Sequence, residues 1–174
     1  MSNHDETLLD LDSVADMQLG GIDDLPEFVT PPDGLYVFGT NTAKINTNKN
    51  KEGKETKKIN HTYFICKVVQ LQNEDELVPD AGNLVGENFT MNPQGLSIWK
   101  LKAKGILGVE LISTKGTIGD VLEELNDNPH YFVGKTRIKK SNKDGTEYEN
   151  VQVQVVRQAT EEDMEDAWLP TEAE

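Results

Sequence analysis

The stretch YFVGKTRIKKSNKDGTEYENVQVQVVRQA, residues 131–159, carries the clearest fold signal of the chain. Residues 131–141 and 146–159 alternate between apolar and polar side chains with a period of two, the pattern of a strand with one buried face. Asn142-Lys143-Asp144-Gly145 lies between them, and an Asp-Gly pair between two alternating segments is a strong hairpin signal. The stretch therefore predicts two antiparallel strands joined by a tight turn.

The same alternation predicts which side chains of this hairpin point outward. Phe132, Ile138 and three valines at positions 151, 153 and 155 form the apolar face. The polar face is expected to carry Tyr131, Lys135, Arg137, Lys139, Tyr148, Gln152 and Gln154. Three cations and Tyr131 would thus share one outward surface of the first of these strands, and Tyr148 would lie on the polar face of the second.

Earlier in the chain, residues 35–45 and 59–71 are rich in β-branched and aromatic residues, which predicts two more strands. The polar stretch 46–58 between them is expected to form a long, mobile, basic hairpin. Residues 84–91 read as a short third strand, and Pro93-Gln94-Gly95 opens an amphipathic helix that runs to about residue 104.

A second short helix is expected after Thr117, whose side chain is placed as an N-cap before Val121 and Leu125. Residues 109–113 fit either a short strand or a loop. The order is then strand, strand, strand, helix, short helix, strand, strand, which predicts a mainly β fold of the α+β class. A closed five-stranded Greek-key barrel with a helix between its third and fourth strands, the OB fold, has this order.

Charge divides the chain into three parts. The net charge is −14, but residues 1–27 hold eight acidic side chains and residues 158–174 hold seven, with no Lys or Arg in either segment. The span 28–157 therefore holds sixteen acids and seventeen bases. We expect an acidic, flexible N-terminal arm over residues 1–30, a folded domain over 31–157 and an acidic C-terminal tail over 158–174.

The bases of the central part are clustered in two patches. The first patch comprises Lys44, Lys49, Lys51, Lys54, Lys57 and Lys58, and the second comprises Lys135, Arg137, Lys139, Lys140 and Lys143. Affinity for phosphate grows with each counterion that a cation cluster displaces, so such clusters favour a nucleic-acid partner. Lysine-rich hairpin tips that are merely solvated would give the same pattern.

Single-stranded nucleic acid also needs exposed aromatic faces on which bases stack. The candidates are Tyr36, Tyr63, Tyr131 and Tyr148, because a hydroxyl group tolerates a wet edge. The phenylalanines at positions 38, 64, 89 and 132, and Trp99, are expected in the core.

The sequence gives little support for a catalytic site or a metal site. His4, His61 and His130 are too scattered for a metal-ligand spacing, and no phosphate-binding loop or nucleophile motif occurs. The acidic row 120–127 lies opposite the apolar residues of a short helix, as a solvated face does. Cys66 sits among apolar strand residues and is expected to be buried. We expect no enzyme activity, no catalytic site, no metal and no cofactor.

The chain lacks the apolar core of a signal peptide, and no apolar run approaches the length of a membrane span. A soluble, cytoplasmic protein is therefore expected. Within the acidic parts, Leu8-Leu9-Asp10-Leu11 and Trp168-Leu169-Pro170 resemble docking segments. The tail is expected to compete for the cationic surface and to bind partner proteins through Asp163, Glu165, Asp166, Trp168 and Leu169.

The chain resembles phage-encoded single-stranded DNA-binding proteins of OB-fold type. The resemblance lies in the acidic opening (Leu9-Asp10-Leu11-Asp12 and residues 23–28), the entry Pro31-Pro32-Asp33-Gly34-Leu35-Tyr36, the basic strand pairs and the acidic C-terminal part. It implies a protein that coats single-stranded DNA with little sequence preference during replication or recombination in the host cytoplasm. It also implies that the acidic tail contacts replication or recombination proteins.

A second reading is a protein-interaction module, such as a phage assembly or host-inhibitor factor, whose acidic arms mimic nucleic acid. Binding of an oligonucleotide that weakens steeply with salt would distinguish the first reading from the second.

Overall fold

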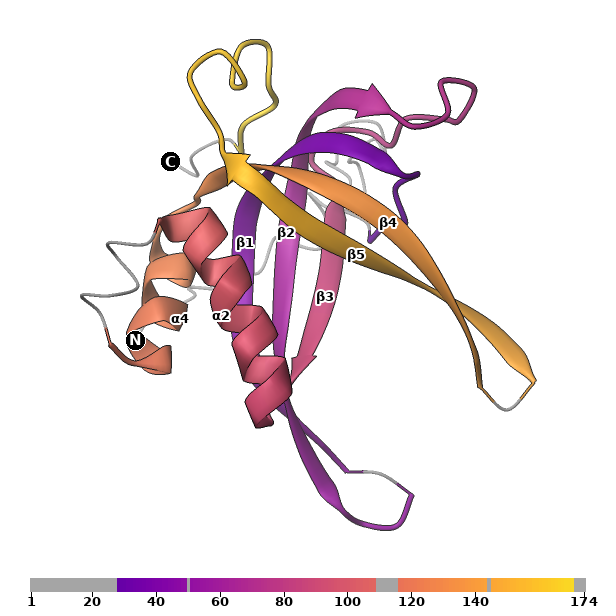
Figure 1. Ribbon diagram of the computed structural model, residues 1–174, viewed down its shortest axis with the longest axis vertical. Coiled ribbons are helices and arrows are strands. Elements are labelled where there is room, and N and C mark those ends of the chain that lie inside the picture. Colours follow the sequence, from indigo (N-terminus) through magenta and orange to yellow (C-terminus); the bar gives the residue numbers. More distant parts are fainter. Residues whose placement is uncertain (1–27, 50, 109–115, 144, 171–174) are drawn as a thin grey trace, which may run out of the picture.

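The computed structural model describes residues 28–49, 51–108, 116–143 and 145–170. These form five strands and two helices: β1 (Gly34–Lys49), β2 (Glu55–Leu71), β3 (Leu84–Thr90), α2 (Pro93–Leu107), α4 (Ile118–Asp127), β4 (Tyr131–Lys143) and β5 (Thr146–Gln158) (Figure 1). The expected order of strands and helices is confirmed. The N-terminal arm up to residue 27, the expected element at 109–113 and the turn residue Asp144 lie outside the described residues.

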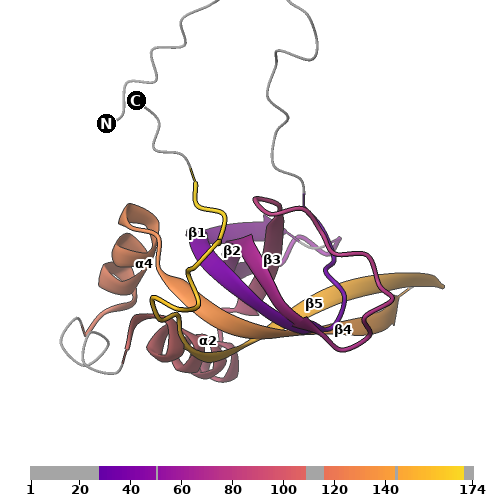
Figure 2. The same cartoon turned by 90° about the horizontal axis from the view of Figure 1, so that it is seen from above.

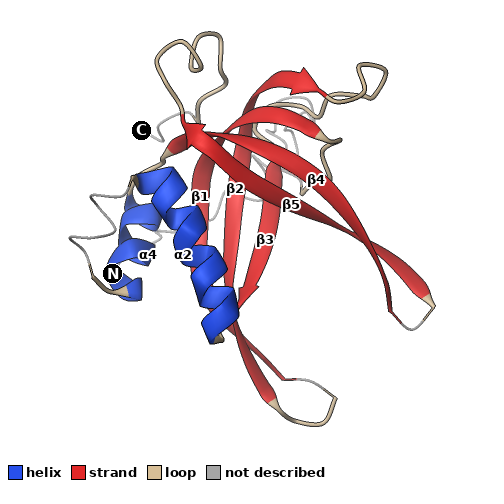
Figure 3. Ribbon diagram, viewed as in Figure 1, coloured by secondary structure: helices blue, strands red, loops and turns tan. Residues whose placement is uncertain are grey.

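All five strands belong to one antiparallel sheet with the order β3-β2-β1-β4-β5. The fold is thus mainly β, as predicted. Figures 2 and 3 show both helices at one side of the sheet, with the β4–β5 ribbon extending away from them. None of the helices in the described part of the chain is long and apolar enough to cross a membrane.

The first hairpin differs from the expected long loop over residues 46–58. β1 and β2 stay paired through this polar stretch as far as Lys49 opposite Glu55. Thr47 and Thr56 lie in the paired region, and β-branched residues suit strands even when they are exposed. The result is a two-stranded ribbon that projects beyond the helices (Figure 1).

The expected closure of the barrel is not found among the described residues, because β3 and β5 remain the two edges of the hydrogen-bonded sheet. Side chains join these edges instead. Lys102 of α2 contacts Glu87 of β3 and donates a hydrogen bond to the carbonyl oxygen of Val153 in β5. We call this junction the seam.

Helix ends follow the local sequence. Asn92 caps α2 by accepting the amide proton of Gly95 at 2.7 Å, and Thr117 caps α4 by accepting that of Asp120 at 3.1 Å. Gly108 ends α2 with a φ of 90°, a conformation that favours glycine.

The central strand β1 is buried on both faces. Its inner face carries Tyr36 and Phe38, which join the main core with side chains from every other strand and both helices. Its outer face carries Val37, which packs with Phe64, Cys66 and Val133 in a second, smaller cluster. As expected, Cys66 is buried.

This second cluster is covered by residues 159–170, which we call the C-terminal segment. Met164 and Ala167 pack on the cluster, and the ring of Trp168 lies 5.6 Å from that of Phe64. The amide of Trp168 donates to the carbonyl oxygen of Cys66 at 2.9 Å. The described part of the expected tail thus packs on the body through apolar side chains that are spaced among its acids.

Candidate functional site

A continuous hollow follows the free edge of β5. It consists of two parts of about 580 and 600 Å³, which share Glu87, Phe89, Ile98 and Gln152 in their linings. Its walls come from α2 and β3 on one side and from β4 and β5 on the other. We call it the edge groove.

The position of α2 determines the width of this groove. A Cβ atom at Gly105 would lie 2.8 Å from a methyl carbon of Val155, so only glycine lets the helix approach β5 this closely. Ile98 and Leu101 lie on the groove side of α2 and are 50% and 73% exposed. An exposed apolar pair in a hollow is typical of a binding surface rather than of a solvated helix face.

Besides Lys102, five cations from three elements surround the edge groove: Lys58 of β2, Lys104 of α2, and Lys135, Arg137 and Lys139 of β4. Among the described residues, no acidic side chain forms an ion pair with any of these five. Within the described part of the chain, the only acid in the lining of these two hollows is Glu87, which is paired with Lys102. The groove is therefore strongly positive.

The β4–β5 ribbon separates its charges by face. The cations of one face stand opposite uncharged amides, in the pairs Lys135 and Gln154, Arg137 and Gln152, and Lys139 and Asn150. Tyr148 follows on the same face and is 50% exposed. The acids Glu147 and Glu149 lie on the opposite face, where Glu147 pairs with Lys140 at 3.6 Å. The predicted alternation is thus confirmed, and the cationic face carries amides that could contact bases.

The seam forms the floor of the groove. Burial raises the pKa of Glu87 and lowers that of Lys102, and the contact between them opposes both shifts. Glu87 also accepts hydrogen bonds from the amide of Val153 and the hydroxyl of Tyr63. Deeper in the core, burial and the charge of Lys102 lower the pKa of His61 to about 3, which keeps its ring neutral near pH 7.

The first predicted patch contributes little to the groove wall. Of its six lysines, only Lys58 lines the groove. The other five, Lys44, Lys49, Lys51, Lys54 and Lys57, lie exposed on the first ribbon or at its tip. In the second patch, Lys140 points to the acidic face of its ribbon, and the backbone of Lys143 pairs with Thr146 at the ribbon end.

Only one of the four predicted stacking tyrosines stands beside the groove cations. Tyr36 and Tyr63 have no exposed surface, which corrects their assignment to a binding face, since their rings fill the core beside Phe38. Tyr131 is half-buried beneath the second cluster, 6.0 Å from the ring of Phe64. Tyr148 alone is exposed on the cationic face.

The predicted partner-binding residues of the tail are partly engaged within the chain. Asp163 binds Arg157, with one N–O distance of 2.8 Å, and accepts hydrogen bonds from Thr160. Arg157 lowers the pKa of this carboxyl group by direct hydrogen bonding. Lys67 donates to the carbonyl oxygen of Glu165 at 2.8 Å, and Asp166 adopts a φ of 58°.

Trp168 rests on Phe64 and Gly82, so its ring is only 39% exposed, whereas Leu169 is 50% exposed. The groove lining contains no residue beyond Val155. The described part of the tail therefore lies outside the lining of the cationic groove in this structure, and tail competition stays a prediction.

Sequence reasoning missed Lys104, Ile98 and Leu101. The sequence does contain a signal for two of them. Ile98 and Leu101 are three positions apart, so on a helix they form a second apolar row beside the buried row of Trp99, Ala103 and Ile106. Which of the two apolar rows is buried depends on how the helix packs against the sheet, and this packing cannot be predicted from the helix sequence alone.

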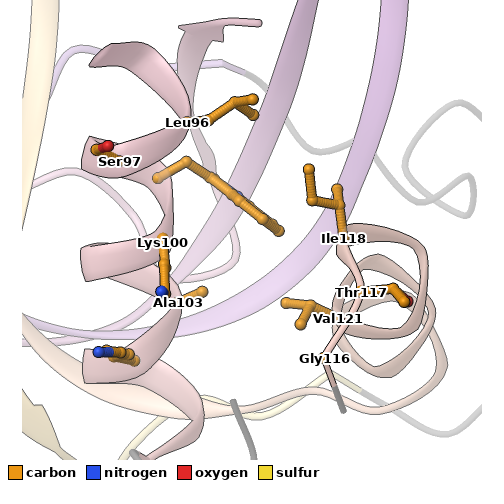
Figure 4. A pocket seen from close by; sticks show the side chains of 10 residues that line it. Leu96, Ser97, Lys100, Ala103, Gly116, Thr117, Ile118 and Val121 are labelled. Carbon is orange, nitrogen blue, oxygen red and sulfur yellow. The ribbon is translucent and has the colours of Figure 1, made fainter. Parts of the chain in front are cut away.

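A further hollow of about 480 Å³ lies between α2 and α4 and shares Lys104 with the edge groove. Leu96, Ala103, Ile118 and Val121 line it with Ser97, Lys100 and Thr117 (Figure 4). Its lining mixes apolar side chains with polar groups and two lysines, and none of the cations of the β4–β5 ribbon lines it. Among the described residues, no group of three or more His, Cys, Asp or Glu side chains is arranged to hold a metal ion.

No family model matches the chain, and no curated protein matches it.

Proposed function

We propose that the chain binds single-stranded DNA along the edge groove and coats it with little sequence preference, in DNA replication or recombination. The observation that carries the proposal is the acid-free face of β4 and β5, where Lys135, Arg137 and Lys139 stand beside amides and Tyr148. Cations bind the phosphates and an exposed ring stacks on bases, the two contacts that sequence-tolerant binding of single strands requires.

The strand order β3-β2-β1-β4-β5, with helices between β3 and β4, supports an OB-type arrangement as the scaffold of this site. In the proposal, Lys104 and Lys58 hold the backbone on the far wall, and Ile98 and Leu101 contact the apolar parts of the sugars and bases. The first ribbon adds lysines that attract the strand from further away. Such a role requires no catalytic group.

Titration of a fluorescent oligo(dT) at several salt concentrations tests the proposal. We expect the affinity to fall steeply with salt, and the triple variant Lys135→Ala, Arg137→Ala, Lys139→Ala to lower the slope of log K against log salt by up to about 2, at about 0.7 for each phosphate contact. The matched control is Lys140→Ala, on the opposite face of the same strand and paired with Glu147.

A slope that changes equally in the control would place the contacts elsewhere. No binding of oligo(dT) at any salt would refute the proposal and favour the protein-interaction module.

A further inference from the structure

The edge groove continues to the point where the described chain begins. Its lower part shares Gly86, Asn88 and Asn150 with a further hollow of about 390 Å³, and Phe28 lines that hollow. Phe28 forms a parallel bridge with Leu84, and the amide of Val29 donates to the carbonyl oxygen of Leu84 at 2.9 Å. The described chain therefore begins, at Phe28, beside one end of the groove.

This attached segment is complementary to the groove in charge. It carries eight acids and no Lys or Arg, whereas the groove is lined by five cations without ion-pair partners among the described residues. Opposite charges at close range attract, and the attraction is stronger in a groove than on an open surface.

The segment is also complementary in its apolar residues. Ile98 and Leu101 are exposed in the groove, where any occupant with apolar groups, a nucleic-acid strand or a peptide segment, would bury them. The sequence LLDLDSVAD at positions 8–16 combines leucines with aspartates at close spacing. Its leucines would bury Ile98 and Leu101 while its aspartates meet the surrounding cations.

The chain is long enough for this contact. Position 16 lies twelve positions before Phe28, and this length of chain spans up to about 40 Å when extended. The groove is bounded by α2 and β3, each about 22 Å long at the usual rise per residue.

We infer that residues 8–16 dock in the edge groove of their own chain and must leave it before a single strand can enter. The evidence for docking is the charge and position of the segment, and it does not depend on the proposed function. The competition with DNA does depend on the proposed function. The N-terminal segment, and not the C-terminal one, is then the internal competitor.

Disulfide trapping in the full-length chain tests the docking without DNA. The variant Leu11→Cys, Leu101→Cys is expected to form an internal disulfide, seen as a faster band on a non-reducing gel, and to form less of it at high salt. The control is Leu11→Cys, Leu77→Cys, because Leu77 is 92% exposed and does not line the groove. Burial raises the pKa of the native Cys66 to about 12, which keeps this thiol out of the reaction.

Equal trapping in both variants, no trapping, or only cross-linked dimers would overturn the inference. Addition of oligo(dT) separates the two proposals: if trapping occurs but oligo(dT) does not reduce it, the docking stands and the proposed function fails. If oligo(dT) binds the chain but trapping does not occur, the function stands and the docking fails.

Affinity measurements give a second test with a matched charge change. Asp10→Asn with Asp12→Asn is expected to tighten oligo(dT) binding by about threefold or more, since the open groove becomes more populated. Glu161→Gln with Glu162→Gln removes the same charge from exposed sites of the C-terminal segment. Equal tightening by both pairs would contradict docking.

Discussion

Tyr148 is the residue that most directly links this surface to bases. Its ring is exposed on the face that carries Lys139 and Asn150, whereas the other tyrosines are buried or covered. We expect Tyr148→Ala to weaken oligo(dT) binding by about 1–2 kcal/mol, close to the contribution of one stacked base. Tyr148→Phe should retain most of the affinity, and equal losses in an anisotropy titration would argue against stacking.

Lys102 differs from the other groove cations because its charge is paired inside the protein and stabilises the fold. It is almost fully buried and joins Glu87 to the backbone of β5. Lys102→Met would leave the Glu87 carboxylate buried without its partner, which should lower the free energy of unfolding by about 3 kcal/mol.

Urea denaturation measures this loss. The double variant Lys102→Met, Glu87→Gln also removes the unpaired buried charge of Glu87 and should recover part of the free energy of unfolding. A double variant as unstable as the sum of the two single variants would show that the pair does not act as a unit.

At the scale of elements, the C-terminal segment acts as part of the sheet's packing. Trp168 lies against Phe64 and against Gly82, where a Cβ atom would come within 3.0 Å of the indole ring. Trp168→Ala should destabilise the fold by about 2 kcal/mol, less than a fully buried tryptophan would, because the ring is partly exposed.

Thermal unfolding followed by circular dichroism tests this expectation. The control is Leu169→Ala at the neighbouring, more exposed position. An equal midpoint for Trp168→Ala and the unmodified chain would show that the segment only rests on the surface.

Elements with local signals could be predicted from the sequence, and elements fixed by distant contacts could not. The β4–β5 hairpin follows from alternation and one Asp-Gly pair, and Thr117 caps α4 as expected. The seam could not be predicted, because it depends on a lysine of α2 reaching two strand edges. The acids around Met164 and Ala167 suggested a solvated tail, and only the tertiary structure reveals the apolar cluster that these two residues cover.

At the scale of the molecule, the body and the C-terminal segment should unfold together. The main core and the second cluster meet on opposite faces of β1, so loss of one exposes the other. The chain has two tryptophans. The fluorescence of Trp99 reports on the main core, and that of Trp168 reports on the C-terminal segment.

We therefore expect the single-tryptophan variants Trp99→Phe and Trp168→Phe each to show a fluorescence transition in urea that coincides with their circular dichroism transition. In the variant that keeps Trp168, a fluorescence change at lower urea concentration than the circular dichroism change would show that the C-terminal segment detaches before the body unfolds.

The place of β1 at the centre of the sheet has a consequence for synthesis of the protein. β1 emerges early from the ribosome, but one of its two neighbours, β4, follows only much later, since Gly34 and Thr136, which share a hydrogen bond, are 102 positions apart. Until then the nascent chain presents an unpaired, apolar strand edge, which is prone to association with other chains. The sheet can form completely only after β4 and β5 have also emerged, so the nascent polypeptide exposes this edge while most of the described body is still being synthesised.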